Sequence, residues 1–243
     1  MEILENIAEY YDELYPVSDE LKKFYKEETK SFFAPIKYLS IGCGAGSFEH
    51  YLARDNADVT GLETVPSLLE SANRKRRNQL MALRFFNMSS LEMCRFLGKS
   101  FYNIITIPNG RIIFTHDVTL MAKLFYDCKQ LLVPHGKLII QLPNFEKYKD
   151  QSLIKLPNRE SIRMRLFSKI RSTENGKNFL YQNIETGNGK LLTVTEDAEI
   201  MMLTKDKIEQ YGKEVGFTKF SFYADYSRND FTSQSDELIV VIS

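Results

Sequence analysis

The amino-acid sequence predicts an α/β fold in which helices cover both faces of a seven-stranded, mostly parallel sheet and a small antiparallel sheet is inserted. Short apolar runs alternate with segments of helical periodicity through most of the chain, which is typical of parallel sheets. After residue 161 the apolar period changes to two, and Asn-Gly pairs at 175–176 and 188–189 indicate hairpin turns. We therefore expect an N-terminal helical cap over residues 1–36, a main domain over 37–145 and 204–243, and an inserted antiparallel subdomain over 146–203.

The first expected element is an amphipathic helix. Apolar residues recur three or four positions apart from residue 3 to residue 15, and Pro16 would end the helix. A second helical segment is expected to begin over residues 21–25. Tyrosines of the first helix, including Tyr11, are expected to pack with their hydroxyls at the rim.

The rest of the chain is organised around residues 37–63, which read KYLSIGCGAGSFEHYLARDNADVTGLE. A short apolar strand leads into glycines at 42, 44 and 46, and glycine tolerates both positive φ and the close approach of a ligand. Ser47 is the expected cap of the following helix, and a second apolar run over 59–62 ends in Glu63. This order is typical of a nucleotide site at the carboxyl edge of a parallel sheet, where the acid accepts hydrogen bonds from ribose hydroxyls.

The glycine spacing distinguishes between nucleotide cofactors. Dinucleotide sites use G-x-G-x-x-G, whereas this turn reads G-x-G-x-G and has Ser47 at the last glycine position. The turn, its flanking strand and helix, and the acid about twenty residues beyond it resemble the first motifs of class I S-adenosylmethionine-dependent methyltransferases. That resemblance covers most of the chain and implies a Rossmann-like fold with S-adenosylmethionine as cofactor. Taken alone, the glycines could instead form a purely structural strand-to-helix turn.

The resemblance also implies site residues. The segment AEYYDELYP is similar to the N-terminal helix of many small-molecule methyltransferases, where a tyrosine that Tyr11 matches covers the cofactor. Asn87 and Met88 follow the third strand, where the family recognises adenine, and Asn109 matches an asparagine of enzymes similar to the glycine and sarcosine N-methyltransferases. Asn87 and Asn109 could each instead be a turn residue. The implied cofactor-binding set is Tyr11, Gly42, Cys43, Gly44, Gly46, Glu63, Thr64, Asn87, Met88, Ile107 and Asn109.

Further elements complete the main domain. A helix over residues 66–78 ends in the basic run 74–77, which either meets nucleic acid or complements the helix dipole, and the neutral chain favours the second. Ser89 or Ser90 is expected to cap a helix after the third strand. Strands are expected at 83–86, 101–107, 137–142, 217–223 and 238–242, and helices at 118–132 and from Thr204 to 213.

The inserted subdomain is expected to be a three-stranded meander over residues 161–203, acting as a lid or as a wall of the acceptor site. Its basic side chains alternate with apolar ones and so share one face. That face either receives an anionic group of a substrate or discourages edge pairing, and we favour the second. The basic residues are Arg163, Arg165, Lys169 and Arg171.

Composition excludes several classes of function. With 32 basic and 32 acidic residues the formal net charge is zero, so no global field attracts nucleic acid or an anionic membrane. No apolar stretch approaches the roughly 20 residues of a membrane span, and the acidic start is unlike a signal peptide. The three cysteines and three histidines form no metal motif, disulfide set or catalytic triad. We therefore expect a cytoplasmic protein.

Three functions are compatible with the sequence. The favoured one is methyl transfer to a small-molecule acceptor bound between Tyr11, Asn109 and the insertion. The alternatives are a non-catalytic protein that binds S-adenosylmethionine as a partner or sensor, and a less favoured NAD-dependent oxidoreductase. No catalytic residue is assigned, because methyl transfer from a sulfonium depends mainly on alignment in a dry pocket. The acceptor and the oligomeric state are left open.

Overall fold

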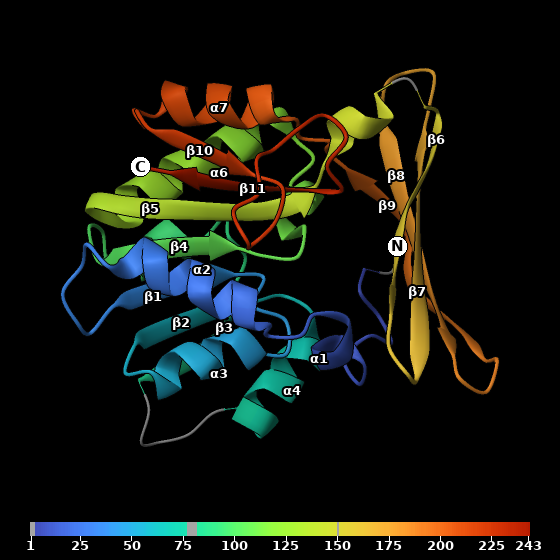
Figure 1. Ribbon diagram of the computed structural model, residues 1–243, viewed down its shortest axis with the longest axis horizontal. Helices are drawn as coiled ribbons and strands as arrows, with labels where there is room; N and C mark the ends of the chain where they lie inside the picture. The colour runs from blue at the N-terminus through green and yellow to red at the C-terminus, as the bar shows by residue number, and fades with distance from the viewer. Residues whose placement is uncertain (1–2, 77–81, 150) are drawn as a thin grey trace.

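The computed structural model describes residues 3–76, 82–149 and 151–243, and contains the expected seven-stranded sheet (Figure 1). Its strands lie in the order β10-β11-β5-β4-β1-β2-β3, and β11 alone is antiparallel to both of its neighbours. The order reverses between β1 and β4, where ligands of open α/β sheets bind. The strands are β1 (Lys37–Ile41), β2 (Asp58–Glu63), β3 (Leu83–Asn87), β4 (Tyr102–Ile107), β5 (Leu132–Pro143), β10 (Phe220–Tyr223) and β11 (Glu237–Ile242).

Helices cover both faces of this sheet, as the sequence predicts. On one face α2 (Asp19–Thr29), α3 (Ser47–Arg54) and α4 (Pro66–Arg76) pack against apolar residues of the central strands. On the other face lie α5 (Met93–Phe96), α6 (Val118–Leu131) and α7 (Lys205–Glu214). Strand residues on both faces are buried, which explains why the central strands read as continuous apolar runs.

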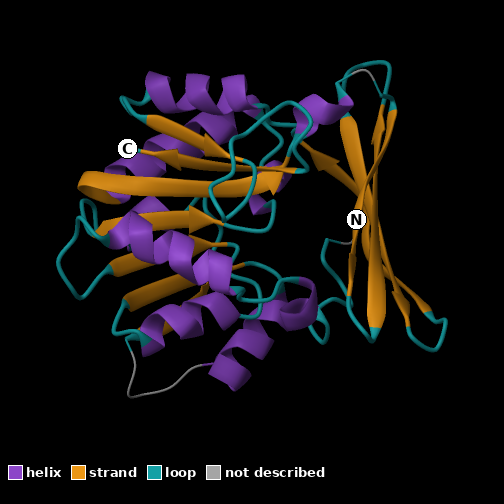
Figure 2. Ribbon diagram, in the orientation of Figure 1, coloured by secondary structure: helices purple, strands orange, loops and turns teal. Residues whose placement is uncertain are grey.

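The insertion forms a four-stranded antiparallel sheet rather than the expected three-stranded meander. Its strands are β6 (Leu153–Glu160), β7 (Met164–Ser172), β8 (Asn178–Thr186) and β9 (Leu191–Ile200). The first strand was missed because Pro157 lies in it and its register against β7 shifts between Leu156 and Arg159, which breaks the period-two pattern. All strands of the main sheet except β11 point toward this second sheet, which stands across their carboxyl ends (Figure 2).

The predicted helix over residues 3–15 is wrong except for α1 (Tyr11–Leu14). Before α1 the chain runs beside β9, where the Glu5 N–H donates to the Val194 carbonyl (2.7 Å). Leu4 and Asn6 have φ angles of 55° and 54°, which are incompatible with a right-handed helix. The apolar residues of this segment are buried between the two sheets, so tertiary contacts override the helical periodicity.

Two of the three predicted caps are absent. Thr204 does cap α7, accepting from the Lys207 N–H, but α3 begins after Gly46, and the Ser47 hydroxyl instead donates to Asp12. Neither Ser89 nor Ser90 caps α5, whose first turn follows Glu92 without a side-chain cap. The predicted helix over 66–78 is present as α4 up to Arg76, and the rest of that prediction lies outside the described residues.

Within the described residues there is no helix long and apolar enough to cross a membrane. That part of the chain also contains no cluster of three His, Cys, Asp or Glu side chains that could hold a metal ion.

Candidate functional site

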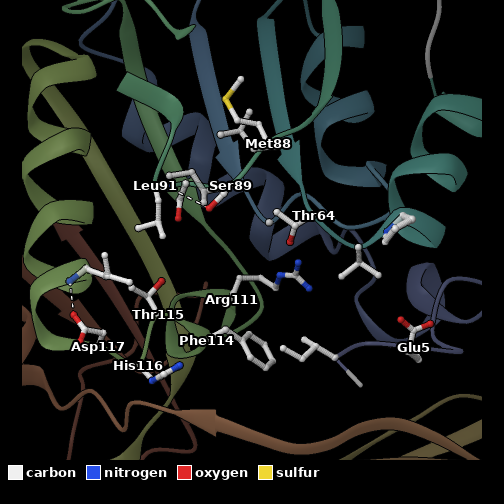
Figure 3. Close-up of a pocket in the computed structure, with 18 residues that line it drawn as sticks. Glu5, Thr64, Met88, Ser89, Leu91, Arg111, Phe114, Thr115, His116 and Asp117 are labelled. Atoms are coloured by element: carbon white, nitrogen blue, oxygen red, sulfur yellow. Dashed lines mark hydrogen bonds between the residues drawn. The ribbon is translucent and has the colours of Figure 1, made fainter. Parts of the chain in front are cut away.

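A cavity of about 460 Å³ opens at the carboxyl ends of β1, β2 and β3, and we call it the edge cavity (Figure 3). Its volume is within the range of roughly 300–1,000 Å³ found for small-molecule sites. The glycine turn contributes Gly42, the end of β2 contributes Thr64, and the segment after β3 contributes Met88. Arg111 and Phe114, from the 3₁₀ helix η1 (Arg111–Phe114) after β4, form the opposite wall.

The glycine turn has the close-approach geometry that its sequence predicts. Gly42, Gly44 and Gly46 have φ angles of 75°, 60° and 77°. A Cβ atom on Gly42 would lie 2.7 Å from the Arg111 side chain, and one on Gly44 would lie 2.2 Å from the Tyr11 ring. Only glycine can therefore occupy these positions beneath the two side chains.

Glu63, at the end of β2, is buried and ties the glycine turn together. One carboxylate oxygen, Oε2, accepts from the Gly44 N–H at 2.9 Å. The other, Oε1, accepts from the N–H groups of Thr64 (2.8 Å) and Val65 (2.9 Å) and from the Arg111 guanidinium (2.5 Å). Among the described residues Thr64 and Arg111 line the edge cavity, whereas Glu63 lies behind them.

Arg111 is a site residue that the sequence analysis missed. Its side chain is only 10% exposed and points into the centre of the edge cavity (Figure 3). The Nη1 atom is buried and has no hydrogen-bond partner among the described residues. The available signal was a lone basic residue in the apolar segment RIIF, directly after the turn that ends β4.

Of the two residues expected to bind adenine, Met88 lines the edge cavity and Asn87 does not. Met88 lines the edge cavity together with Ser89, Ser90 and Leu91. Asn87 is paired with Glu63 in the parallel register of β2 and β3, but its side chain is exposed and lies outside the residues that line the cavity. Its role in adenine recognition stays a prediction.

Tyr11 and Asn109, which were both expected beside the acceptor, are in hydrogen-bond contact. The Asn109 side-chain amide donates to the Tyr11 hydroxyl at 3.2 Å, and the Asn109 N–H donates to the Gln141 side-chain oxygen at 2.6 Å. Burial raises the pKa of Tyr11 well above its usual range, so the phenol stays protonated. Ile107, by contrast, is buried in the apolar core, where it contributes packing.

A smaller cavity, which we call the side cavity, has a volume of about 220 Å³ and lies between the glycine turn and α2. Cys43 and Glu49 line it, and burial raises the pKa of the Cys43 thiol. Glu49 accepts from the Ser40 hydroxyl at 2.5 Å, and its Oε2 atom is buried without a partner in the described residues. Burial also raises the pKa of Glu49 to about 7.

A third cavity, of about 490 Å³, lies between the main sheet and the inserted sheet, and we call it the inter-sheet cavity. Tyr11, Asn109 and Gln141 line it from one side, and Ser168 and Gln182 line it from the inserted sheet. The Arg159 guanidinium, from β6, donates to Glu237 at 2.6 Å and stacks over the Tyr15 ring at 4.9 Å. Arg111 and Phe114 line both this cavity and the edge cavity, so the two cavities adjoin.

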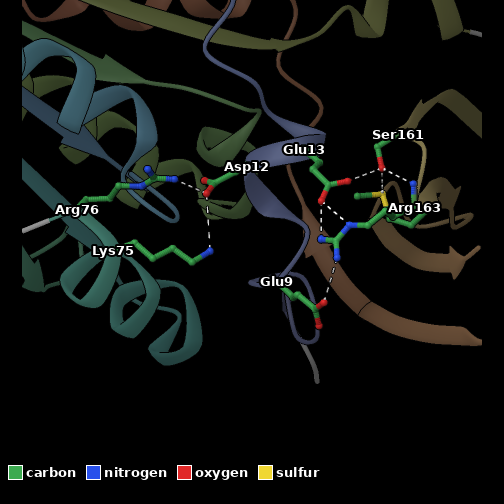
Figure 4. A network of polar contacts seen from close by, with 8 residues as sticks. Glu9, Asp12, Glu13, Lys75, Arg76, Ser161 and Arg163 are labelled. Carbon is green, nitrogen blue, oxygen red and sulfur yellow. Dashed lines mark hydrogen bonds and ion pairs between the residues drawn. The ribbon is translucent and has the colours of Figure 1, made fainter.

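The basic residues singled out in the insertion serve mainly in ion pairs. Arg163 pairs with Glu13 at 2.5 Å and lies near Glu9, so it fastens the N-terminal segment to the inserted sheet (Figure 4). On the other side of that segment Asp12 pairs with Arg76, which places part of the basic run of α4 in a structural contact. Arg165 likewise pairs with Glu160 at 2.6 Å.

The chain is similar to known proteins over most of its length. Residues 34–211 match the family model described as a methyltransferase domain. A curated relative from Geobacillus sp. (strain WCH70) that carries a methyltransferase name is 24% identical over 251 residues, covering 98% of both chains.

Solved structures share the fold at low identity. The CcbJ methyltransferase from Streptomyces caelestis superimposes with a TM-score of 0.78 at 15% identity, covering 98% of this chain and 96% of the other. An amino pentose methyltransferase from Micromonospora echinaspora, solved with S-adenosylmethionine bound, has a TM-score of 0.66 at 16% identity, covering 99% and 98%.

Proposed function

The chain belongs to the methyltransferase domain family and is an S-adenosylmethionine-dependent enzyme, and on that premise we propose that it methylates a small polar acceptor held in the inter-sheet cavity. The observation that carries this proposal is the wall shared by the edge and inter-sheet cavities. A cofactor in the first and an acceptor in the second would meet beside Arg111 and Phe114. The inserted sheet then acts as one wall of the acceptor site.

Several features fit the cofactor to the edge cavity. Gly42, the first glycine of the turn, lines the edge cavity beside the Arg111 side chain and has no Cβ atom of its own to fill that space. Glu63 places a buried carboxylate at the end of β2, and the guanidinium of Arg111 offers an unpartnered donor beside it. Met88 and Leu91 offer apolar surface for a base. The methionyl end would extend past Gly44 toward the side cavity and Cys43.

When bound, S-adenosylmethionine supplies an activated methyl group on a sulfonium, and the chain has to orient the acceptor and exclude water. Asn109 is fixed through its N–H by Gln141 and through its amide by Tyr11, so its side chain is held in one orientation at the junction of the cavities. Because Tyr11 stays protonated, we assign it a positioning role rather than that of a base.

The lining of the inter-sheet cavity favours a neutral, hydroxyl-bearing or amine-bearing acceptor. Gln182 donates to the Ser168 hydroxyl at 2.9 Å on the inner face of the inserted sheet, which leaves amide and hydroxyl groups facing the cavity. The Arg159 cation is neutralised by Glu237, so the cavity offers no unpaired positive charge from β6. An amino sugar or a small hydroxyl-bearing amine has matching donor and acceptor groups.

The test is an acceptor screen with S-adenosylmethionine labelled in its methyl group. Amino sugars, small amines, amino acids, a duplex DNA and an unfolded protein are incubated separately with the enzyme. We expect label in one of the small polar acceptors and none in the polymers. Transfer only to a polymer, or tight cofactor binding with no transfer to any small acceptor and no effect of acceptors on that binding, would contradict the proposal.

A further inference from the structure

Arg111 stands between the buried carboxylate of Glu63 and the edge cavity, and it reaches the cavity surface where Glu63 does not. We propose that Arg111 is a ribose-binding residue, whose guanidinium donates to a hydroxyl oxygen of the cofactor while it remains paired with Glu63. This inference rests on the proposed cofactor position in the edge cavity. It assigns the ribose contact to Arg111, which Glu63 holds in place, rather than to the acid itself.

The first argument concerns the acceptor capacity of Glu63. Its Oε1 atom already receives three donors, two backbone N–H groups and the Arg111 guanidinium, and its Oε2 atom receives the Gly44 N–H. A carboxylate offers about four lone-pair sites in total. The carboxylate therefore has little free capacity for two further hydroxyl donors as long as Arg111 stays in place.

The second argument concerns the ease with which Arg111 could leave. Its side chain lies directly on Gly42, and its backbone is fixed by an N–H donated to the Pro108 carbonyl at 3.1 Å. Separating a buried ion pair is costly, because the carboxylate of Glu63 would lose the one charged partner that it has among the described residues. The edge cavity keeps a volume of about 460 Å³ with Arg111 in this position, so a nucleoside can enter without displacing it.

The third argument concerns the unused donor. The Nη1 atom of Arg111 is buried without a partner in the described part of the chain, and a buried donor that stays unpaired is unfavourable. A ribose hydroxyl oxygen can accept from the guanidinium of Arg111, which its pairing with Glu63 holds beside the edge cavity.

The opposite role would be that of a plug. Arg111 would then occupy the ribose position in the free enzyme and would have to swing away before Glu63 could bind the diol. The two roles make opposite predictions for an enzyme that lacks the guanidinium. If Arg111 binds the ribose, removing its guanidinium weakens cofactor binding. If Arg111 is a plug that blocks the ribose position, removing its guanidinium strengthens cofactor binding.

The experiment measures binding by calorimetry, with S-adenosylhomocysteine and its 2′,3′-dideoxy analogue as the two ligands. It compares the full-length wild type with Arg111→Met and Arg111→Lys. Arg84→Met is the matched control, because Arg84 also pairs with an acid, Asp58, but lies at the exposed edge of the main sheet. Thermal unfolding of each variant checks that it is folded, and Arg111→Lys keeps a charge beside Glu63 if Arg111→Met is too unstable.

We expect Arg111→Met to weaken binding of S-adenosylhomocysteine about tenfold and to leave binding of the dideoxy analogue within about twofold of wild type, as for a lost hydrogen bond to a charged group. Arg111→Lys should fall between, and Arg84→Met should match wild type. Equal or tighter binding of S-adenosylhomocysteine by both Arg111 variants would overturn the proposal in favour of the plug. A wild type that binds neither ligand would instead contradict the proposed cofactor site.

Discussion

The main sheet and the inserted sheet contribute to the site in different ways. In the main sheet the groups that matter follow the strand ends: the glycine turn after β1, Glu63 at the end of β2, and Asn109 after β4. In the inserted sheet they lie within strands, as Ser168 does in β7 and Gln182 in β8, and face the cavity from the sheet surface. The cofactor side is thus built largely from backbone geometry and the acceptor side from exchangeable side chains. Substitutions on the cofactor side should therefore change mainly stability and cofactor affinity, whereas those on the acceptor side should change mainly the KM for the acceptor.

The largest effect is expected from adding one methyl group to the glycine turn. Gly44→Ala would combine a strained φ with a Cβ atom placed 2.2 Å from the Tyr11 ring. The strain and the overpacking together should cost about 4 kcal/mol of unfolding free energy, measured by urea unfolding. Gly176→Ala is the matched control, because its φ is 79° but nothing lies within 4 Å of the added atom, so about 1 kcal/mol is expected. If both variants lose the same unfolding free energy, the close approach of Tyr11 to Gly44 does not contribute to the loss.

The next largest effect concerns pH and Glu49 on the cofactor side. Because burial raises the pKa of Glu49 from 4.5 to about 7, the folded state binds this proton more tightly than the unfolded state does. The stability that this provides is complete below pH 4.5 and is lost as the pH rises through 7, by about 3 kcal/mol at 1.36 kcal/mol per unit. Glu49→Gln should flatten this part of the curve of unfolding free energy against pH between 5 and 8. If the wild type and Glu49→Gln have the same slope, the pH dependence of the unfolding free energy comes from other groups.

A smaller effect is expected from removing the acid of β2. Glu63→Ala should weaken binding of S-adenosylhomocysteine by about 1.5–3 kcal/mol, because the glycine turn and Arg111 lose their common carboxylate partner. Calorimetry measures the affinity, and Glu160→Ala serves as a control because Glu160 pairs with Arg165 at the exposed surface of the insertion. Unchanged affinity in Glu63→Ala would remove this residue from the site.

The smallest effect should be confined to the acceptor side. Arg159→Met leaves Glu237 without its cation in the inter-sheet cavity, so the KM for the acceptor should rise about tenfold. The affinity for S-adenosylhomocysteine should stay within about twofold of wild type. Arg165→Met, which removes an exposed ion pair of the same inserted sheet, should change neither quantity. A fall in cofactor affinity with no change in KM would show that Arg159 serves the cofactor rather than the acceptor.

The same contrast explains what could be predicted from the sequence. The glycine turn and the strand that ends in Glu63 depend on local patterns and were recognisable from residue type and spacing, whereas the seven-stranded, mostly parallel sheet was implied by the family resemblance. Arg111 was missed because its importance arises from a contact 48 positions away, with Glu63. The irregular segment before α1 and the broken register of β6 were missed for the same reason, since partners distant in sequence override the local pattern.

The N-terminal segment also determines the order in which the molecule can be completed during synthesis. The Leu4 N–H donates to the hydroxyl of Thr195, a partner 191 positions later in the chain. At typical elongation rates of about 5–20 residues per second, Leu4 waits roughly 10–40 seconds for that partner to be made. Ile3 and Glu5, on either side of Leu4, line the edge cavity, so this wall of the cavity can be completed only after Thr195 has been made. A nascent chain stalled before β9 should therefore fold much of its main sheet and still lack this wall of the cavity.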